Sequence, residues 1–173
     1  MSAAQNECQS LVLAILTISD SRTRADDTSG DLLQACALDA GHQVKARHIV
    51  PDDRYQVRAL VSEWIADREI QAVLTTGGTG LTGRDGTPEA ILPLLDKCID
   101  GFGELFRALS YQEIGTSTLQ SRCLAGVANG TVVICMPGST NACRLAWDKI
   151  IQFQLDSRTQ PCNLVQLMPR FKE

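Results

Sequence analysis

The sequence predicts one α/β domain of 173 residues, built in three layers, α/β/α, around a mixed and mainly parallel β-sheet. The run Leu11–Ile18 is almost entirely apolar, which is typical of a strand buried on both faces of a parallel sheet. Strand-like and helix-like patterns then alternate through most of the chain, as expected for an α/β fold. The pair Asn129-Gly130 separates two apolar segments and predicts one antiparallel hairpin. We expect a core over about residues 11–158 and an irregular C-terminal tail from Thr159.

A strand, a loop and a helix follow one another two times in the first half of the chain. After the first strand, a polar loop leads into a helix that ends at Gly41, a residue suited to a C-cap. The apolar stripe of that helix consists of Leu33, Cys36, Ala37 and Ala40. Val44–Val50 predicts a second strand, and Asp52 or Asp53 is placed to cap the helix that follows. The apolar stripe of this second helix consists of Val57, Leu60, Val61, Trp64 and Ile65.

The second half contains the rest of the sheet and three further helices. Ala72–Thr76 predicts a short third strand. Thr87-Pro88-Glu89 opens a helix, with Thr87 as N-cap, Pro in the first turn and an acid beside it, and we expect this helix to run to about Cys98. Another short helix is expected within Gly101–Ser110. The hairpin strands and the final helix are expected at Leu124–Ala128, at Thr131–Met136 and around Trp147, Ile150 and Ile151.

Composition argues against several classes of protein. The net charge of −4 speaks against wholesale nucleic-acid binding, and no apolar run approaches the ~20 residues of a membrane span. The seven cysteines are odd in number and form no C-x-x-C pair, so we expect reduced thiols and a cytoplasmic protein. The only histidines, His42 and His48, lack the spacing of a zinc site.

Three loops follow the carboxyl ends of predicted strands. They are the first loop (Ser19–Gly30), the glycine loop (Thr76–Thr87) and the P-G loop (Pro137–Thr140). All are rich in Gly, Ser, Thr or Asp, and each leads into a helix N-terminus, which favours anions. In open α/β sheets, ligands bind at this edge of the sheet. Three such loops together predict a site for a ligand with several phosphates, although polar turns also connect such elements without any ligand.

The glycine loop matches two nucleotide-binding patterns only in part. Residues 78–83 read G-x-G-x-x-G, but a lone match is a weak indication of a dinucleotide site. The predicted helix starts later, at Thr87, and the motif follows the third strand rather than the first. A P-loop is excluded more firmly, because no Lys follows the glycines.

Asp85, at the far end of the glycine loop, indicates a metal ion. A carboxylate in a phosphate-binding loop repels the phosphate unless a cation lies between them, and Mg²⁺ commonly binds one or two carboxylates together with substrate oxygens. Asp52 follows the second strand and could supply a second carboxylate at the same edge. The alternatives are a turn-forming role for Asp85 and a helix N-cap role for Asp52.

Hydroxyl and guanidinium groups precede the hairpin. Ser117, Ser121 and Arg122 lie there, and the planar fork of an Arg suits bidentate phosphate binding. An exposed Arg without a ligand is an equally good interpretation of Arg122.

Five motifs in order give the sequence a family resemblance. The motifs are, in chain order, DDTSGDLL, TTGGTGLTGRDGTPEAI, GFGELFR, TSTLQSR and MPGST. Together they resemble the molybdenum cofactor biosynthesis proteins of the molybdopterin adenylyltransferase group, over about Leu11 to Asn163. The resemblance implies a mixed, mainly parallel α/β fold and a homotrimer or homohexamer. It also implies transfer of AMP from ATP to the terminal phosphate of molybdopterin, with Mg²⁺, and release of pyrophosphate.

The resemblance also implies which residues form the site. It assigns catalysis and Mg²⁺ binding to Asp85, with Asp52 in support. With the hydroxyl groups already noted, the expected substrate-binding residues are Asp27, Ser29, Gly30, Thr76, Gly77, Gly78, Thr79, Gly80, Ser117, Ser121, Arg122, Pro137, Gly138 and Ser139.

Two functions remain open from the sequence. The first is the adenylyltransferase itself, with molybdopterin and ATP as its substrates and other molybdenum cofactor biosynthesis proteins as possible partners. The second is a non-catalytic molybdopterin-binding or carrier protein on the same fold. The retained Asp85 and Asp52 favour the first. The P-G loop favours the second, because it reads Pro-Gly-Ser-Thr-Asn where many family members continue with a second Pro.

Overall fold

The sheet has six strands in the order β2-β1-β3-β6-β5-β4. In this computed structural model residues 8–173 are described, and the first seven residues of the predicted 1–173 domain lie outside that range. Strands β2, β1, β3 and β6 run parallel, and β5 and β4 continue the sheet in antiparallel pairs. The strands are β1 (Val12–Ile18), β2 (Gln43–Val50), β3 (Ala72–Thr76), β4 (Lys97–Cys98), β5 (Leu124–Ala128) and β6 (Thr131–Met136).

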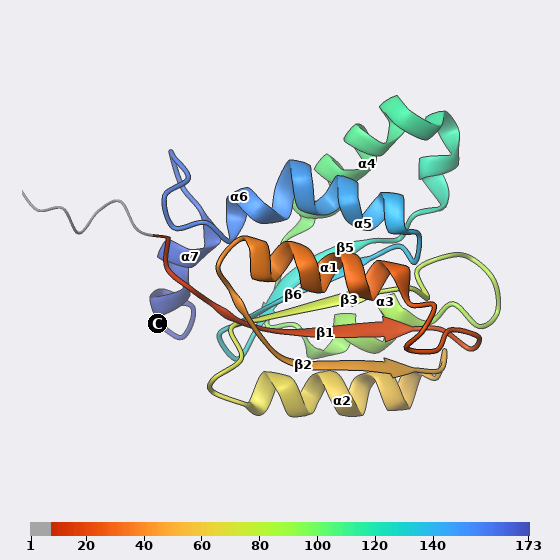
Figure 1. Ribbon diagram of the computed structural model, residues 1–173, viewed down its shortest axis with the longest axis horizontal. Coiled ribbons are helices and arrows are strands. Elements are labelled where there is room, and N and C mark those ends of the chain that lie inside the picture. The colour runs from red at the N-terminus through yellow and green to blue at the C-terminus, as the bar shows by residue number, and fades with distance from the viewer. Residues whose placement is uncertain (1–7) are drawn as a thin grey trace, which may run out of the picture.

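Helices cover both faces of the sheet (Figure 1), which confirms the predicted three-layer α/β fold. One face packs against α1, α4 and α5, and the other packs against α2 and α3. The helices are α1 (Thr28–Asp39), α2 (Arg54–Ala66), α3 (Thr87–Ile91), α4 (Asp100–Ile114), α5 (Thr140–Ala146), α6 (Gln152–Gln154) and α7 (Leu164–Leu167). Shorter turns are the 3₁₀ segments η2 (Leu92–Leu94), η3 (Gly115–Gln120) and η5 (Met168–Arg170) and the π segment η4 (Trp147–Ile151).

Successive side chains of the buried strands pack alternately into two hydrophobic cores, one on each face of the sheet. In β1, Leu13 and Ile15 face the α1 and α5 layer, while Ala14 and Leu16 face the α2 layer. This two-residue alternation with apolar side chains on both faces explains why β1 is apolar at every position except Thr17. The parallel strands end at one edge of the sheet, where the three predicted loops begin (Figure 1).

The hairpin forms as predicted, and its turn has the expected backbone. Asn129 and Gly130 have φ angles of 50° and 86°, the left-handed values that a type I′ turn requires. The hairpin is not the outer edge of the sheet, because β4 pairs with β5 beyond it.

The helix predicted from Thr87 to about Cys98 is shorter than expected. It ends at Ile91, turns through η2, and is followed by β4 at Lys97–Cys98. Pro93 accounts for the difference, because proline has no N–H for the helical ladder and its ring clashes with the preceding turn. The N-cap position falls on Gly86 rather than Thr87.

Two further expectations are resolved by the described residues. Asp53, not Asp52, caps α2, and its side chain accepts hydrogen bonds of 2.9 Å from the N–H groups of Tyr55 and Gln56. The tail is not irregular throughout, because it forms α7 and η5 and buries Val165 in the core.

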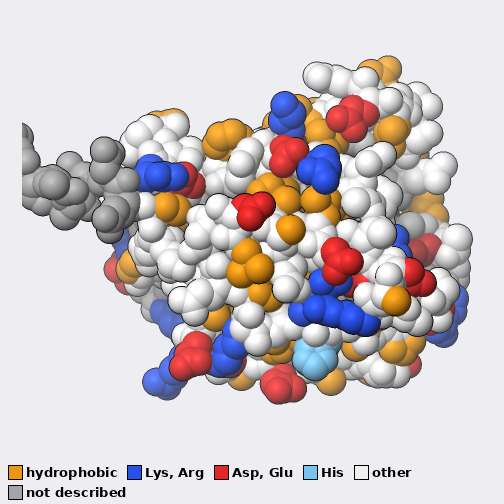
Figure 2. Space-filling view, in the orientation of Figure 1, with side chains coloured by type: hydrophobic (Ala, Val, Ile, Leu, Met, Phe, Trp, Pro, Cys, Tyr) orange, Lys and Arg blue, Asp and Glu red, His pale blue; other side chains and the backbone are white. Residues whose placement is uncertain are grey.

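No helix in the part of the chain that the structure describes is both long and apolar enough to cross a bilayer. Acidic and basic side chains are interspersed over the face shown in Figure 2. All seven cysteines are free thiols.

Candidate active site

A cavity of about 610 Å³ lies at the carboxyl ends of β1, β3 and β6. The three loops form one side of it, and α4 with η3 forms the other. Ten of the residues predicted to form the site line this cavity: Gly77, Gly78, Thr79, Gly80, Asp85, Ser117, Ser121, Pro137, Gly138 and Ser139. Segments more than a hundred residues apart in the sequence therefore meet at one site.

Close approach of the backbone explains two of the glycines. Gly77 and Gly78 have φ angles of 104° and 65°. A Cβ on Gly77 would lie 2.1 Å from the carbonyl oxygen of Ile18, and a Cβ on Gly78 would lie 2.3 Å from Oγ1 of Thr87. Thr87 donates to the carbonyl oxygens of both glycines, through its Oγ1 to Gly77 at 2.9 Å and its N–H to Gly78 at 3.0 Å. These carbonyl groups are thereby engaged by the protein itself.

Asp85 lies on the cavity wall as an ionised carboxylate. Its Oδ2 accepts hydrogen bonds from Oγ1 of Thr82 at 2.6 Å and from the Thr82 N–H at 2.9 Å. These hydrogen bonds hold the pKa of Asp85 below its usual range. A charged carboxylate is therefore maintained beside the glycine loop.

Asp52 does not line the cavity but lies directly behind the glycine loop. Its Oδ1 would be 2.8 Å from a Cβ on Gly78, and its N–H donates to Oδ1 of Asp20 at 3.0 Å. Burial raises the pKa of Asp52, and the carboxylates of Asp20 and Asp85 raise it further. Negative charge is thus concentrated around this part of the loop.

This arrangement fits a cation shared with a ligand. Among residues 8–173 no group of three or more His, Cys, Asp or Glu side chains is placed to hold a metal by itself. Mg²⁺, however, usually keeps one or two carboxylates and takes its other ligands from water and substrate phosphates. Asp85 supplies such a carboxylate on the cavity wall. A cation beside it would also offset the negative charge of Asp20 and Asp85, which raises the pKa of Asp52 in addition to the larger effect of burial.

An ion pair that the sequence did not indicate joins two of the loops. Arg84 of the glycine loop binds Asp20 of the first loop in a bidentate manner, at 2.6 and 2.9 Å. The same Asp20 accepts the N–H of Asp52. Arg84 is therefore a link between loops that also orients the backbone beside Asp52.

Arg122 braces the glycine loop and is absent from the lining of the cavity. Its Nε donates to the carbonyl oxygen of Gly80 at 2.8 Å, and its second guanidinium nitrogen donates to that of Asp85 at 3.0 Å. Its remaining terminal nitrogen pairs with Glu89. The guanidinium predicted to bind phosphate is thus committed to the protein.

We expect Arg122→Met to destabilise the folded state by about 1 to 3 kcal/mol, because partly buried carbonyl groups lose their donor. Urea denaturation measures this loss, and hydrogen exchange should show faster opening of the glycine loop. Arg58→Met is the matched control, since Arg58 donates to carbonyl oxygens of Glu89 and Ala90 in α3 but not to the glycine loop. Equal exchange rates in the two variants would contradict the bracing role.

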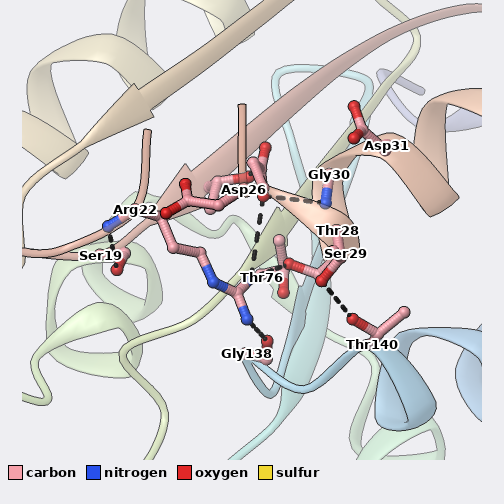
Figure 3. A network of polar contacts seen from close by, with 12 residues as sticks. Ser19, Arg22, Asp26, Thr28, Ser29, Gly30, Asp31, Thr76, Gly138 and Thr140 are labelled. Carbon is pink, nitrogen blue, oxygen red and sulfur yellow. Dashed lines mark hydrogen bonds and ion pairs between the residues drawn. The ribbon is translucent and has the colours of Figure 1, made fainter. Parts of the chain in front are cut away.

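The predicted substrate-binding residues Asp27, Ser29 and Gly30 are buried at the start of α1, where they belong to a network of polar contacts (Figure 3). Asp27 is fully buried, caps α1 through the N–H of Gly30 at 3.0 Å, and accepts Oγ1 of Thr17 at 2.9 Å. A Cβ on Gly30 would lie 2.1 Å from Oδ2 of Asp27, so only glycine fits there. Ser29 is buried as well and is bonded to Arg22. None of the three predicted residues lies on the cavity wall.

Thr76 also supports the site from behind. It is fully buried, and its Oγ1 donates to the carbonyl oxygen of Pro137 at 2.9 Å. The end of β3 is thereby tied to the P-G loop. Ser139 of that loop lines the cavity and also caps α5, accepting the N–H of Ala142 at 3.2 Å.

Sequence reasoning missed several residues that line the cavity. They are Ile18, Ser19 and Arg22 around the first loop, Ala142 of α5, and Phe106, Ser110, Ile114 and Gln120 of α4 and η3. Arg22 lies in a loop that was expected to bind ligand, but nothing in the pattern separates it from Arg24. Phe106 and Ser110 are four residues apart and share one face of α4, yet Phe106 resembles any apolar core residue.

The family model, the related sequences and the solved structures that match this chain all point to the same family. The family described as "Probable molybdopterin binding domain" matches residues 14–157. The chain is 57% identical over 163 residues to Molybdenum cofactor biosynthesis protein B of Escherichia coli (strain K12), covering 94% of this chain and 96% of that protein. It is 48% identical over 138 residues to a protein of the same name from Bacillus cereus, covering 79% and 82% respectively.

A solved structure of Molybdenum cofactor biosynthesis protein B is similar with a TM-score of 0.82 and 46% identity, covering 85% of this chain and 92% of that one. The tungsten cofactor synthesizing protein MoaB from Pyrococcus furiosus is similar with a TM-score of 0.79 and 33% identity, covering 95% and 99%. Sequence and fold agree over most of the length of each protein. The chain therefore belongs to the family of molybdenum cofactor biosynthesis proteins that share this molybdopterin binding domain.

Proposed function

We propose that this protein binds molybdopterin in the cavity between the three loops and transfers AMP to its phosphate from Mg-ATP, releasing pyrophosphate. The observation that carries the proposal is the meeting of three donor-rich loops with Asp85 at one cavity, in a chain of this family. The ring system of molybdopterin would lie toward Phe106 and Ile114, and its phosphate toward the three loops.

The proposed reaction joins two polyanions and requires no covalent bond between the protein and a substrate. An oxygen of the molybdopterin phosphate would attack the α-phosphorus of ATP and form a new P–O bond. The bond between the α-phosphorus and the oxygen that bridges it to the β-phosphorus would break, and pyrophosphate would leave. Positioning and charge stabilisation supply most of the rate enhancement in such reactions. When bound, Mg²⁺ would neutralise charge on the leaving pyrophosphate.

The chain's own residues have distinct proposed roles. Asp85 would hold the metal ion from the cavity wall. Asp52, behind the glycine loop, would have a supporting role at the same metal ion or its water shell. Backbone and hydroxyl groups of Gly77–Gly80, Ser117, Ser121 and Pro137–Ser139 would contact the substrates. Arg122, Thr76 and the Asp27 network would act indirectly, by keeping the loops in place.

Pyrophosphate release tests this proposal. Pure protein is mixed with Mg-ATP and molybdopterin, and pyrophosphate is assayed with either substrate omitted as a control. Release that requires both substrates is the expected result. A protein that binds molybdopterin but releases no pyrophosphate with any divalent metal would instead be a carrier.

We expect a homotrimer or a dimer of trimers. An apolar hollow of about 200 Å³ lies between α4 and the C-terminal helices, lined by side chains that include Phe102, Ile150 and Leu164. Leu105 on its rim and Phe153 in α6 are each 48% exposed, which favours burial against another subunit. Light scattering should give three or six times the 18.8 kDa monomer mass. A mass that stays at the monomer value as concentration rises would contradict this expectation.

The cytoplasm is the compartment that we propose for this activity. Free thiols at the exposed Cys98 and Cys162 suit a reducing environment, and ATP is available there. Other molybdenum cofactor biosynthesis proteins would supply the pterin and receive the product.

A further inference from the structure

Arg22 is the only Lys or Arg among residues 8–173 that lines the cavity. The inference that follows rests on the proposed function, in which both substrates, molybdopterin and ATP, carry phosphate groups. Backbone N–H groups can bind an anion, but a guanidinium adds a full positive charge and a planar fork. The side chain of Arg22 is 27% exposed, so it is held by the protein yet accessible from the cavity.

Hydrogen bonds to neutral groups fix the position of Arg22. One terminal nitrogen donates to Oγ of Ser29, and the other donates to the carbonyl oxygen of Gly138 at 2.9 Å (Figure 3). The side chain therefore spans from the first loop to the P-G loop. Neither acceptor neutralises its charge.

Other arginines around the loops differ from Arg22 in this respect. Arg84 lies 2.6 Å from a carboxylate oxygen of Asp20, and Arg122 pairs directly with Glu89. Arg47 lies 2.6 Å from carboxylate oxygens of both Asp27 and Asp31. Each of these guanidinium groups has a carboxylate at hydrogen-bond distance.

The carboxylate nearest to Arg22 is already committed elsewhere. The nearest ion-pair contact of Arg22 is Oδ1 of Asp27, at 3.7 Å, which is beyond a normal hydrogen bond. Asp27 instead bonds to Arg47 at 2.6 Å, deep in the protein. The positive charge of Arg22 is thus the least compensated of the four, and it is the one that faces the cavity.

We propose that Arg22 binds a phosphate group of the substrate, between the first loop and the P-G loop. The phosphate could belong to molybdopterin or to ATP, and the chemistry of recognition is the same for both. The competing interpretation is that Arg22 only ties two loops together. That role would affect all ligands of the cavity alike, whereas phosphate binding affects phosphorylated ligands selectively.

Equilibrium binding of four probes to the parent, Arg22→Gln and Arg22→Lys separates these roles. The probes are molybdopterin, its phosphatase-treated form, ATP and inorganic pyrophosphate. Losing one charge-assisted contact should weaken binding of the phosphorylated ligand about 10- to 100-fold in Arg22→Gln, with the dephosphorylated pterin changed less than about threefold. Selective loss for molybdopterin assigns the contact to its phosphate, and selective loss for ATP assigns it to the nucleotide. Arg24→Gln is the matched control, because Arg24 is an exposed Arg of the same loop that does not line the cavity.

The outcomes decide between the interpretations. Equal weakening of phosphorylated and dephosphorylated pterin, or unchanged binding of all four probes, would overturn the proposal. If Arg22→Gln does not fold, Arg22→Lys is decisive: it keeps the charge but not both hydrogen bonds, and should retain a preference for the phosphorylated ligand over the dephosphorylated one. If the parent binds neither molybdopterin nor ATP, the proposed function fails, and Arg22 is judged by pyrophosphate alone. Pyrophosphate binding that requires Arg22 would still support the inference, and its absence in the parent would overturn it.

Discussion

Replacing Asp85 by asparagine is expected to lower the rate of AMP transfer by on the order of 10²-fold or more, about 2.7 kcal/mol of transition-state stabilisation. Asparagine keeps the size of the side chain and an oxygen that can accept the hydrogen bonds of Thr82, but it removes the charge. Folding and molybdopterin affinity should stay within a few-fold of the parent. Single-turnover formation of adenylylated molybdopterin measures the rate, and fluorescence follows pterin binding separately.

Two neighbouring carboxylates provide comparisons for Asp85→Asn. Asp52→Asn should have a milder effect, because Asp52 lies behind the glycine loop rather than on the cavity wall. Asp53→Asn should leave the rate unchanged, since asparagine serves equally well as the N-cap of α2. Normal turnover by Asp85→Asn with lost pterin binding would show that Asp85 is a pterin contact and not a metal ligand.

Replacing Asp27 by alanine is expected to cost about 3 to 5 kcal/mol of folding free energy, the typical cost of breaking a buried ion pair. Asp27 is completely buried, and the Arg47 side chain that it binds is only 5% exposed. Without Asp27, that guanidinium loses its buried carboxylate, and Thr17 and the N–H of Gly30 lose their acceptor. Urea denaturation at fixed protein concentration measures the loss.

Asp31→Ala is a closely matched control for Asp27→Ala. Asp31 binds the same Arg47 at the same distance of 2.6 Å, but its side chain is 60% exposed. Its removal should cost about 0 to 1 kcal/mol, because solvent screens an exposed pair. Similar losses in the two variants would contradict the importance of burial in this network.

Acid denaturation should reveal the contribution of Asp27 to stability by an independent measurement. Burial alone would raise the pKa of Asp27, but its hydrogen bonds, chiefly the one from Arg47, hold that pKa below its usual range. A carboxyl group with a depressed folded-state pKa stabilises the fold above its unfolded pKa of about 3.9, and this stabilisation is lost as the pH falls through the folded value. The stability of Asp27→Ala should therefore decline less steeply than that of the parent below about pH 4. If the stability of parent and Asp27→Ala declined equally steeply below about pH 4, Asp27 would not contribute to stability in this way.

Local patterns were sufficient to predict most of the sheet. The strand β3 was predicted at Ala72–Thr76, where it is found, because a short apolar run ends at consecutive glycines. The hairpin followed from Asn129-Gly130, since few other residue pairs tolerate left-handed backbone at both positions. The carboxyl ends of parallel strands then brought the predicted loops together.

Long-range side-chain contacts could not be predicted in the same way. Arg122 and Asp27 were assigned to substrate because their motifs suggested ligand binding, but their partners lie far away in sequence. Arg122 bonds to Gly80 across 42 residues, and Arg47 reaches Asp27 across 20 residues. Only the folded structure shows that the Arg122 guanidinium and the Asp27 carboxylate bind protein groups that support the loops.

The wall formed by α4 and η3 was the least predictable part of the site. Phe106 has the apolar character of a core residue, and Ser110 has no distinguishing neighbour. Their role at the cavity depends on how α4 packs beside β5 and α5, and no short pattern encodes that placement. Pro93, by contrast, was visible in the sequence and should have ended the predicted helix earlier.

A crystal structure with molybdopterin and a non-transferable ATP analogue tests most directly whether the cavity at the carboxyl ends of β1, β3 and β6 is the reaction site. The expected result is that the phosphates of both ligands lie between the first loop, the glycine loop and the P-G loop, with a divalent cation joining them to Asp85. Molybdopterin bound on another surface, such as the apolar hollow beside α4, with the cavity left to solvent, would contradict the account.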